Sequence, residues 1–469
     1  MPKIAVIGAG SMVFSRALLS DILAFDALKD TEFALMDVDA ERLAVAKAMA
    51  ESINRTRKAA ARITATDDRR AAIDGADYVI NTIGVGGLAA TKLDLSIPEK
   101  YGVRQVISDT LCMGGIFRTL RSLPIVLEMA AEMERLCPEA LLLTYTNPMA
   151  THVLGVARAS KVRVVGLCHG IRYTRARMIM LARLAQMSGT EAKKVLDARV
   201  SPHEPGGTEF SRFFHSCLSE PGYETLAAGI NHMAAFVVFR KDGQDQYPWL
   251  FKAAADPDIR QIELVRLELM QRFGYFMTET CGHISEYLPW FNKSDSEIKR
   301  LAIRPNAYLL TCADLEKTAA EYRRKAASGE PFIRPDEPIS AEYASRIINA
   351  VETDSPFVFN GNVHNAGGAL ISNLPADCCV EVPCVADASG IRPTRFGELP
   401  PQCAAMMRTN VNVQDLIVES VLQRKREHVY HAAMLDPNTA ATLTLPKIAE
   451  MVDEMIAAYG DLMPQYLRA

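Results

Sequence analysis

The fold is decided by the stretch KIAVIGAGS at residues 3–11, in which an apolar run enters a glycine turn. Residues 12–25 have the apolar spacing of a helix, and residues 33–36 form a second apolar run that ends at Asp37. A strand, a glycine turn, a helix and a second strand in this order predict one βαβ unit.

The turn at Gly8 and Gly10 stands where a dinucleotide site requires small residues. Their lack of bulk lets backbone N–H groups approach a pyrophosphate, and Ser11 begins the helix whose N-terminus would face it. Val13 replaces the third glycine of the usual pattern. Asp37 can accept both ribose hydroxyls of an adenosine and would repel a 2′-phosphate, so these residues predict NAD rather than NADP. The alternative is a glycine turn with a helix-capping aspartate.

The alternation of strands and helices continues through the first third of the chain. It predicts an α/β fold with a doubly wound, mostly parallel Rossmann-like sheet, as in lactate and malate dehydrogenases. Gly84, in the segment 83–87, is expected to touch the dinucleotide, with a plain glycine turn as the alternative. From about residue 199 the pattern becomes mixed. We expect an NAD-binding domain over residues 1–198 and an α+β domain for substrate, metal and oligomer contacts over residues 199–469.

The composition disfavours several classes of protein. The 469 residues are 49% hydrophobic and 23% charged, as in a globular chain, and a net charge of −4 gives no footprint for nucleic acid or an anionic membrane. The sequence has neither a long apolar span nor the features of a signal peptide, so we expect a cytoplasmic protein. Ten cysteines are too few for a disulfide scaffold. A cysteine with a special role is therefore expected to be a metal ligand or a nucleophile.

A second group of candidates follows a later strand. Cys168 and His169 come directly after the apolar run at residues 162–167, so both emerge at the carboxyl edge of the sheet, where open α/β folds bind ligands. His232 supplies another imidazole. A thiolate and an imidazole with open positions fit a catalytic divalent metal. Packing of the cysteine in the core and a structural histidine are the alternatives, and spacing alone does not decide between them.

Ordered motifs extend over nearly the whole chain: GAGS at 8–11, DT at 109–110, GGIFR at 114–118, NPM at 147–149, CHG at 168–170 and GINH at 229–232. Together they resemble family 4 of the glycoside hydrolases, whose NAD-dependent members are exceptions to the two-carboxylate scheme. Within that family the chain is most similar to the melibiase-type α-galactosidases, by the segments at residues 286–291, 373–375, 378–382 and 430–437.

The resemblance implies a glycosidase that works by transient oxidation. In the family, tightly held NAD oxidises the C3 hydroxyl of the sugar, a base removes the acidified C2 proton, and the glycosidic bond breaks by elimination. Water and NADH then reverse the steps, and a metal bound to the sugar O2 and O3 stabilises the enediolate. Carried over by motif, Cys168 and His232 are the expected metal ligands, with Mn²⁺ as the expected ion.

The resemblance also assigns roles to polar residues of these motifs. His169 matches the general acid that assists the leaving group, with a hydrogen bond to a sugar hydroxyl as the alternative. Asn147 is expected to bind sugar hydroxyls, unless it is only a turn residue before a proline. Asp109 is expected to contact the sugar or the acid, with helix capping as the alternative. Arg118 is expected to bind substrate.

The base that removes the C2 proton is a tyrosine or an aspartate in the family. The segment 279–287 offers Tyr287, which we expect to act as this base once nearby cations lower its pKa. Packing is the alternative role for this ring. His283 and Glu286 stay as candidates for the base or for substrate binding.

Two departures leave the identity of the sugar open. Leu-Cys-Met at residues 111–113 stands where relatives usually have smaller residues, so this loop is bulkier. Gly170 matches the uronide-hydrolysing members, whereas melibiase-type members have serine there. Residues 201–224 also look like an insertion, whose basic residues either bind an anionic sugar or lie in a solvated loop.

We therefore expect an NAD- and Mn²⁺-dependent α-galactosidase that acts on substrates such as melibiose. An α-glucosidase, an α-galacturonidase or an α-glucuronidase of the same family are the alternatives. An NAD-dependent 2-hydroxy acid dehydrogenase is the alternative from another class. The expected partner is a small sugar glycoside, not nucleic acid or a membrane. The resemblance also implies a homodimer or homotetramer, with the apolar C-terminal helices as the expected interface.

Overall fold

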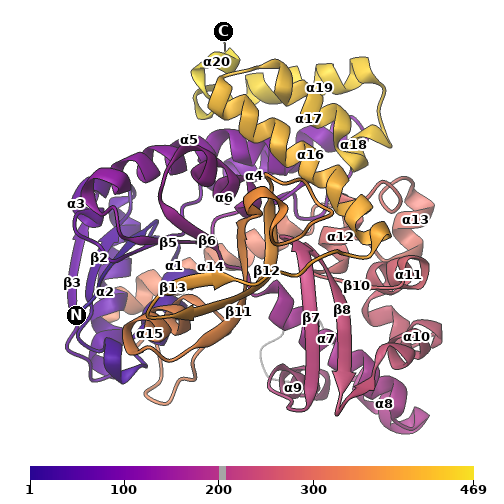
Figure 1. Cartoon of the computed structure of the whole chain (residues 1–469), viewed down its shortest axis with the longest axis horizontal. Coiled ribbons are helices and arrows are strands. Elements are labelled where there is room, and N and C mark those ends of the chain that lie inside the picture. Colours follow the sequence, from indigo (N-terminus) through magenta and orange to yellow (C-terminus); the bar gives the residue numbers. More distant parts are fainter. Residues whose placement is uncertain (200–207, 469) are drawn as a thin grey trace.

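The computed structural model describes residues 1–199 and 208–468, which form helices around one 13-stranded sheet (Figure 1). From one edge to the other its strands are β10 (Phe276–Met277), β8 (Met233–Lys241), β7 (Tyr223–Ile230), β12 (Cys379–Asp387), β11 (Phe357–His364), β6 (Arg163–Gly166), β5 (Leu141–Thr144), β4 (Tyr78–Asn81), β1 (Lys3–Ile7), β2 (Glu32–Met36) and β3 (Arg62–Thr66). Two short strands, β9 (Gln244–Asp245) and β13 (Gly390–Pro393), pair with β8 and β12.

The N-terminal half of the chain builds the parallel part of this sheet. Strands β3-β2-β1-β4-β5-β6 are all parallel and follow the 3-2-1-4-5-6 order of a Rossmann fold, which confirms the predicted doubly wound sheet. Ile7 pairs with both Met36 and Asn81, so β1, β2 and β4 end together at the carboxyl edge. The glycine turn after β1 lies at that edge.

Helices flank the parallel strands, with α2, α3 and α6 among those that pack on them. The helices of this half are α1 (Met12–Ile22), α2 (Ala40–Thr56), α3 (Arg69–Ile73), α4 (Gly87–Lys100), α5 (Cys112–Leu136), α6 (Met149–Ala159), α7 (Gly170–Gln186) and α8 (Gly189–Asp197). Those that follow are α9 (Glu209–Leu218), α10 (Tyr247–Ala255), α11 (Leu264–Phe273), α12 (Cys281–Tyr287), α13 (Asp295–Arg300), α14 (Tyr308–Ser328), α15 (Ala344–Thr353), α16 (Pro401–Gln423), α17 (Glu427–Leu435), α18 (Pro437–Ala440), α19 (Leu445–Tyr459) and α20 (Gln465–Arg468). Among the described residues, none of the helices combines the length and apolar character needed to cross a membrane.

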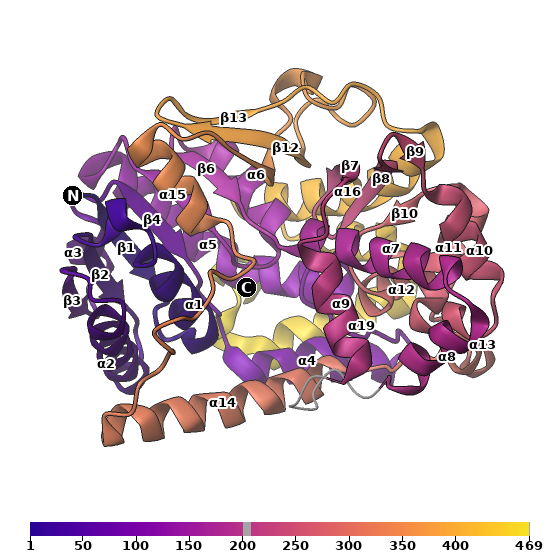
Figure 2. The ribbon, with the colours of Figure 1, turned by 90° about the horizontal axis from the view of Figure 1, so that it is seen from below.

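The C-terminal half extends the same sheet with antiparallel strands. Asn362 of β11 pairs with Gly166 of β6, and Glu381 of β12 pairs with Gly229 of β7. Helices of this half also pack on those of the N-terminal half, since α15 packs on α1, and α14 spans from α2 to α4 along one side of the molecule (Figure 2). The domain boundary near residue 199 stays a prediction, because one sheet runs through both halves.

A buried ion pair joins α4 and α5 beneath the C-terminal helices. The Arg121 guanidinium donates to both carboxylate oxygens of Asp94 at 3.0 and 2.6 Å, and both side chains have 0% exposure. The Tyr459 hydroxyl of α19 donates to the same carboxylate. Arg121 Nε donates to the carbonyl of Val85 at 3.0 Å, so this pair also holds the glycine-rich segment 83–87.

Replacing Arg121 by methionine leaves the Asp94 charge buried without its partner. We expect Arg121→Met to lower the free energy of unfolding by about 3–5 kcal/mol. Urea unfolding followed by circular dichroism measures the change. The matched control is Lys447→Met, which breaks the exposed Lys447–Glu450 pair on α19 and should leave the transition midpoint nearly unchanged. Equal effects of the two substitutions would contradict this prediction.

Candidate active site

The predicted dinucleotide turn packs tightly against its neighbours. Gly8 has φ +85°, and a Cβ there would lie 2.8 Å from the backbone nitrogen of Ile83. The N–H of Gly10 donates to Asp37 Oδ2 at 2.8 Å. A Cβ on Gly10 would lie 2.6 Å from that oxygen, so both positions require glycine.

The other residues predicted for NAD surround the same turn. The N–H of Ser11 donates to the Gly8 carbonyl at 2.9 Å where α1 begins. Gly84 follows β4 and faces open space, since a Cβ there would meet no atom within 4 Å. The ends of β1, β2 and β4 thus gather all five residues, and their role in binding NAD stays a prediction.

Three side chains from distant segments form a candidate metal group. Cys168 follows β6, His232 stands in the turn between β7 and β8, and Glu279 follows β10. Their ligand atoms all lie within 4.8 Å of one another. The Cys168 thiol donates to Glu279 Oε1 at 3.6 Å. The structure therefore brings the two predicted ligands together and adds a carboxylate that the sequence analysis did not identify.

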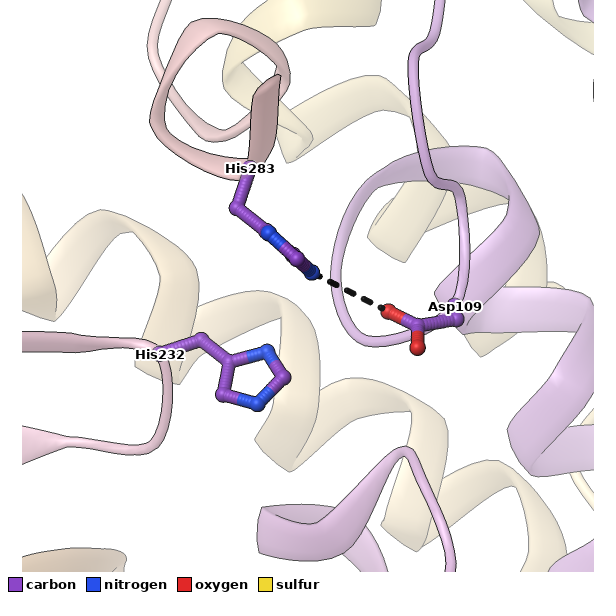
Figure 3. A group of neighbouring side chains, drawn as sticks. All are labelled: Asp109, His232 and His283. Carbon is purple, nitrogen blue, oxygen red and sulfur yellow. Dashed lines mark ion pairs between the residues drawn. The ribbon is translucent and has the colours of Figure 1, made fainter. Parts of the chain in front are cut away.

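A second group shares His232 with the first. Asp109, in the loop before α5, and His283, on α12, point toward one another and toward His232 (Figure 3). His283 Nε2 lies 3.8 Å from Asp109 Oδ1. The Thr110 hydroxyl lies 2.8 Å from Asp109 Oδ1, to which it donates, and 3.0 Å from His232 Nδ1. Thr110 thereby fixes the orientation of the imidazole, as partners of metal-binding histidines do.

The histidines of this centre lower the pKa values of its two carboxylates. Burial alone would raise the pKa of Glu279, but His232, His283 and His169 lower it below the usual range. Burial likewise opposes the charge of Asp109, and the imidazoles together with Arg118 lower its pKa. Both carboxylates therefore stay ionised.

The pKa of the Cys168 thiol shifts in the opposite direction, away from the charged form. Burial and the Glu279 carboxylate raise its pKa well above the usual value. A divalent cation beside this pair would compensate the carboxylate and favour the thiolate. The donor set of one sulfur, one nitrogen and one oxygen thus fits a divalent metal.

His169 lies beside this centre with 41% of its side chain exposed. Its Nδ1 lies 2.8 Å from Glu342 Oε1. Burial alone would lower the pKa of His169, but the hydrogen bond and the charge of Glu342 raise it. A histidine oriented by a carboxylate in this way can donate a proton near neutral pH.

Gly170 makes room for the carboxylate of the metal group. A Cβ on Gly170 would lie 1.6 Å from Glu279 Oε1 and 3.3 Å from Cys168 Sγ. The N–H of Gly170, at the start of α7, donates to Cys168 Sγ at 3.3 Å. Glycine at position 170 therefore has a steric reason here.

Asn147 and Arg118, both predicted to bind substrate, lie near Asp109. The Asn147 amide donates to Asp109 Oδ2 at 3.1 Å, while its buried Oδ1 has no partner among the described residues. Arg118 donates to the Thr91 hydroxyl at 3.3 Å, and its charge helps to lower the pKa of Asp109. Asn231, next to His232, is fully buried and has no partner for either amide atom within the described chain. These amides could bind hydroxyl groups of a ligand.

Tyr287 and Glu286 are both fully buried at the end of α12. The Tyr287 hydroxyl lies 3.5 Å from His232 Nδ1, and burial together with Asp109 raises its pKa. Glu286 accepts hydrogen bonds from the backbone N–H groups of residues 106–108, at 2.5 to 3.0 Å. Burial nevertheless raises the pKa of Glu286 to about 8. Glu286 thus anchors the loop that carries Asp109.

Models of known families match two parts of the chain. The family 4 glycosyl hydrolase model matches residues 3–184, and the model of the family 4 C-terminal domain matches residues 227–439. Two solved structures have the same fold. They are a 6-phospho-α-glucosidase from gut microorganisms with NAD and Mn²⁺ (TM-score 0.76, 20% identity, 99% of each chain covered) and the 6-phospho-β-glucosidase of Thermotoga maritima with manganese, NAD⁺ and glucose-6-phosphate (TM-score 0.71, 18% identity, 98% of this chain and 99% of the other).

Similarity to characterised sequences also spans nearly the full length. An α-galactosidase of Bacillus subtilis is 39% identical over 99% of this chain and 100% of its own. An α-galactosidase of Rhizobium meliloti is 35% identical over 100% of this chain and 90% of its own. Motif order, fold and full-length identity agree, and the chain belongs to family 4 of the glycosyl hydrolases.

Proposed function

We propose that this protein is an NAD- and Mn²⁺-dependent α-galactosidase. The observation that carries the proposal is the convergence of Cys168, His232 and Glu279 within 4.8 Å, at the end of a Rossmann sheet whose first turn fits a dinucleotide. The two α-galactosidases at 39% and 35% identity support the choice of sugar.

The residues that would hold the two cofactors come from separate parts of the site. Gly8, Gly10, Ser11, Asp37 and Gly84 would hold NAD. The three-residue metal group and its neighbour Asp109 would hold the ion and the sugar hydroxyls beside it. When bound, the nicotinamide would accept and return a hydride, and the metal would act as a Lewis acid.

His169 is the proposed acid for the glycosidic oxygen. Glu342 holds its Nδ1, so a proton on Nε2 can be donated to the leaving group. The partly exposed ring lies where a leaving group can depart toward solvent.

Tyr287 is the proposed base for the C2 proton. Its hydroxyl is close to His232 Nδ1, and a cation nearby would lower the pKa that burial raises. His283, whose ring centre lies 5.9 Å from that of Tyr287, is the second candidate. Glu286 has its oxygens occupied by backbone N–H groups, which favours an anchoring role for it.

An α-galacturonidase is the second candidate function. Gly170 favours it, because uronide-hydrolysing members have glycine at this position. An α-galacturonidase of Thermoanaerobacter italicus is 25% identical over 97% of this chain and 95% of its own. Self-association as a dimer or tetramer is part of the proposal but does not bear on this choice.

A panel of 4-nitrophenyl α-glycosides tests the proposed function directly. With NAD, Mn²⁺ and a thiol reductant in D₂O, we expect nitrophenol from the galactoside and deuterium at C2 of the released sugar, because the C2 proton exchanges during catalysis. EDTA should stop the reaction. Cleavage of the galacturonide alone would establish the second candidate. Net formation of NADH from a 2-hydroxy acid without glycoside cleavage would establish a dehydrogenase instead.

Removing one ligand should weaken the metal site without affecting the dinucleotide site. We expect Cys168→Ser and Glu279→Gln each to reduce Mn²⁺ affinity at least about tenfold and to abolish turnover, with NAD affinity nearly unchanged. Isothermal titration calorimetry measures the affinity for Mn²⁺ and the affinity for NAD. Cys137→Ser, which changes a buried cysteine outside this group, is the control and should bind Mn²⁺ normally. Normal Mn²⁺ affinity in Cys168→Ser would eliminate the assignment.

The contact between Gly170 and Glu279 gives a separate test. A serine Cβ at position 170 would overlap the carboxylate, so Gly170→Ser should displace Glu279 and lower Mn²⁺ affinity by about tenfold. Gly189→Ser at the start of α8 is the matched control, since a Cβ there meets no atom within 4 Å. If both variants bind Mn²⁺ like the parent protein, Glu279 is not a ligand.

A further inference from the structure

A row of aromatic rings leads from the proposed acid to the surface. The ring centres of His169 and Tyr173 are 5.0 Å apart, in an edge-on arrangement. Tyr173 and Phe214 follow with parallel rings 6.3 Å apart. Tyr173 stands one helical turn after His169, and its N–H donates to the His169 carbonyl at 3.1 Å. The row therefore begins at the imidazole that would protonate the glycosidic oxygen.

The outer part of this row belongs to a segment that the family models do not match. Residues 185–226 lie between the two matched regions and include α8 and α9. Residues 201–224 have no single role that their sequence predicts. Of these, residues 208–224 are described, and they form α9 and the start of β7 rather than a solvated loop. α9 packs beside α7 and brings Phe214 to Tyr173 (Figure 2).

Phe214 is held in place by a charged side chain beneath it. The Arg177 guanidinium of α7 lies 4.6 Å from the centre of the Phe214 ring, within the range of a cation–π contact. Arg177 in turn pairs with the buried Glu263 at 3.1 Å. The ring is therefore fixed before any ligand arrives, which lowers the entropic cost of binding.

Tyr173 is left open to solvent although its ring is large. Its exposed fraction is 40%, and it is one of few large apolar or aromatic side chains of the described residues with so much exposed surface. An exposed aromatic ring beside a catalytic group is typical of a ligand contact, because it offers an apolar face and needs little side-chain ordering. The C–H face of a pyranose ring is the complementary surface.

We propose that Tyr173 and Phe214 form a platform for the first sugar ring of the leaving group. The platform rests on the proposed function, which makes His169 the acid that faces the leaving group. It would bind a hexopyranose through the apolar faces of the rings. The site would then discriminate between leaving groups that contain a ring and small alkyl leaving groups, independently of the galactose-binding part.

Steady-state kinetics on two substrates tests the platform. We expect Tyr173→Ala to lower kcat/KM for melibiose about tenfold, mainly through KM, and to leave methyl α-galactoside within about twofold of the parent enzyme. Tyr173→Phe should retain the melibiose rate because it keeps the ring. Phe214→Leu should show a smaller loss of the same kind. Phe251→Ala on α10 removes an aromatic side chain that is also 40% exposed and should change neither rate.

Binding of free glucose, the sugar released from melibiose, gives a readout that does not need turnover. Saturation-transfer NMR should detect glucose on the parent protein and on Phe251→Ala but not on Tyr173→Ala. Equal losses on both substrates, unchanged kinetics, or glucose binding that survives Tyr173→Ala would overturn the platform. A parent protein that binds glucose through Tyr173 but cleaves no α-galactoside would refute the proposed activity and leave the platform standing.

Discussion

The candidate active site depends on the register of one row of paired residues across four strands. Gly166 pairs with Asn362, which pairs with Glu381, and Glu381 pairs with Gly229. The thiol and the imidazole proposed as metal ligands stand two residues after Gly166 and three residues after Gly229. A slip of one residue would displace one ligand by about 3.3 Å. That displacement is most of the 4.8 Å within which the ligand atoms lie. The metal group therefore forms only when the two halves of the sheet pair in this register.

The buried carboxylates around this row divide into two kinds. Burial raises the pKa values of Glu286 and Glu381 to about 8, and the charge of Glu279 adds to the rise at Glu381. The backbone N–H groups that donate to Glu286, and the Asn362 amide that donates to Glu381, offset these rises only in part. Asp109 and Glu279 instead face imidazoles, which lower their pKa values. Negative charge is thus concentrated at the two carboxylates that flank the shared histidine. A cation bound there would gain attraction that the outer, more neutral carboxyl groups do not provide.

The parts of the site that could be predicted from the sequence are those tied to local patterns. The βαβ unit with its glycine turn, and Cys168 at the end of an apolar strand, follow from strand ends that a single sequence reveals. Glu279 was missed because it meets Cys168 across 111 residues, and only the tertiary fold brings them together. Glu286 was expected near substrate from its motif. Its carboxylate accepts the N–H groups of residues 106–108, a role for which no sequence spacing gives a signal.

The metal group and the proposed platform for the leaving group are held in the fold by different kinds of contact. The metal group is fixed by strand pairing, where any change in spacing alters the register. Helix α9, which lies between the regions that the family models match, joins the molecule mainly by packing on α7, with ring stacking and a cation–π contact at Phe214. Packing of this kind tolerates exchange of side chains at modest cost, since no ladder hydrogen bond depends on it. Substitutions on α9 can therefore alter the surface met by a leaving group while the row beneath the metal group stays in register.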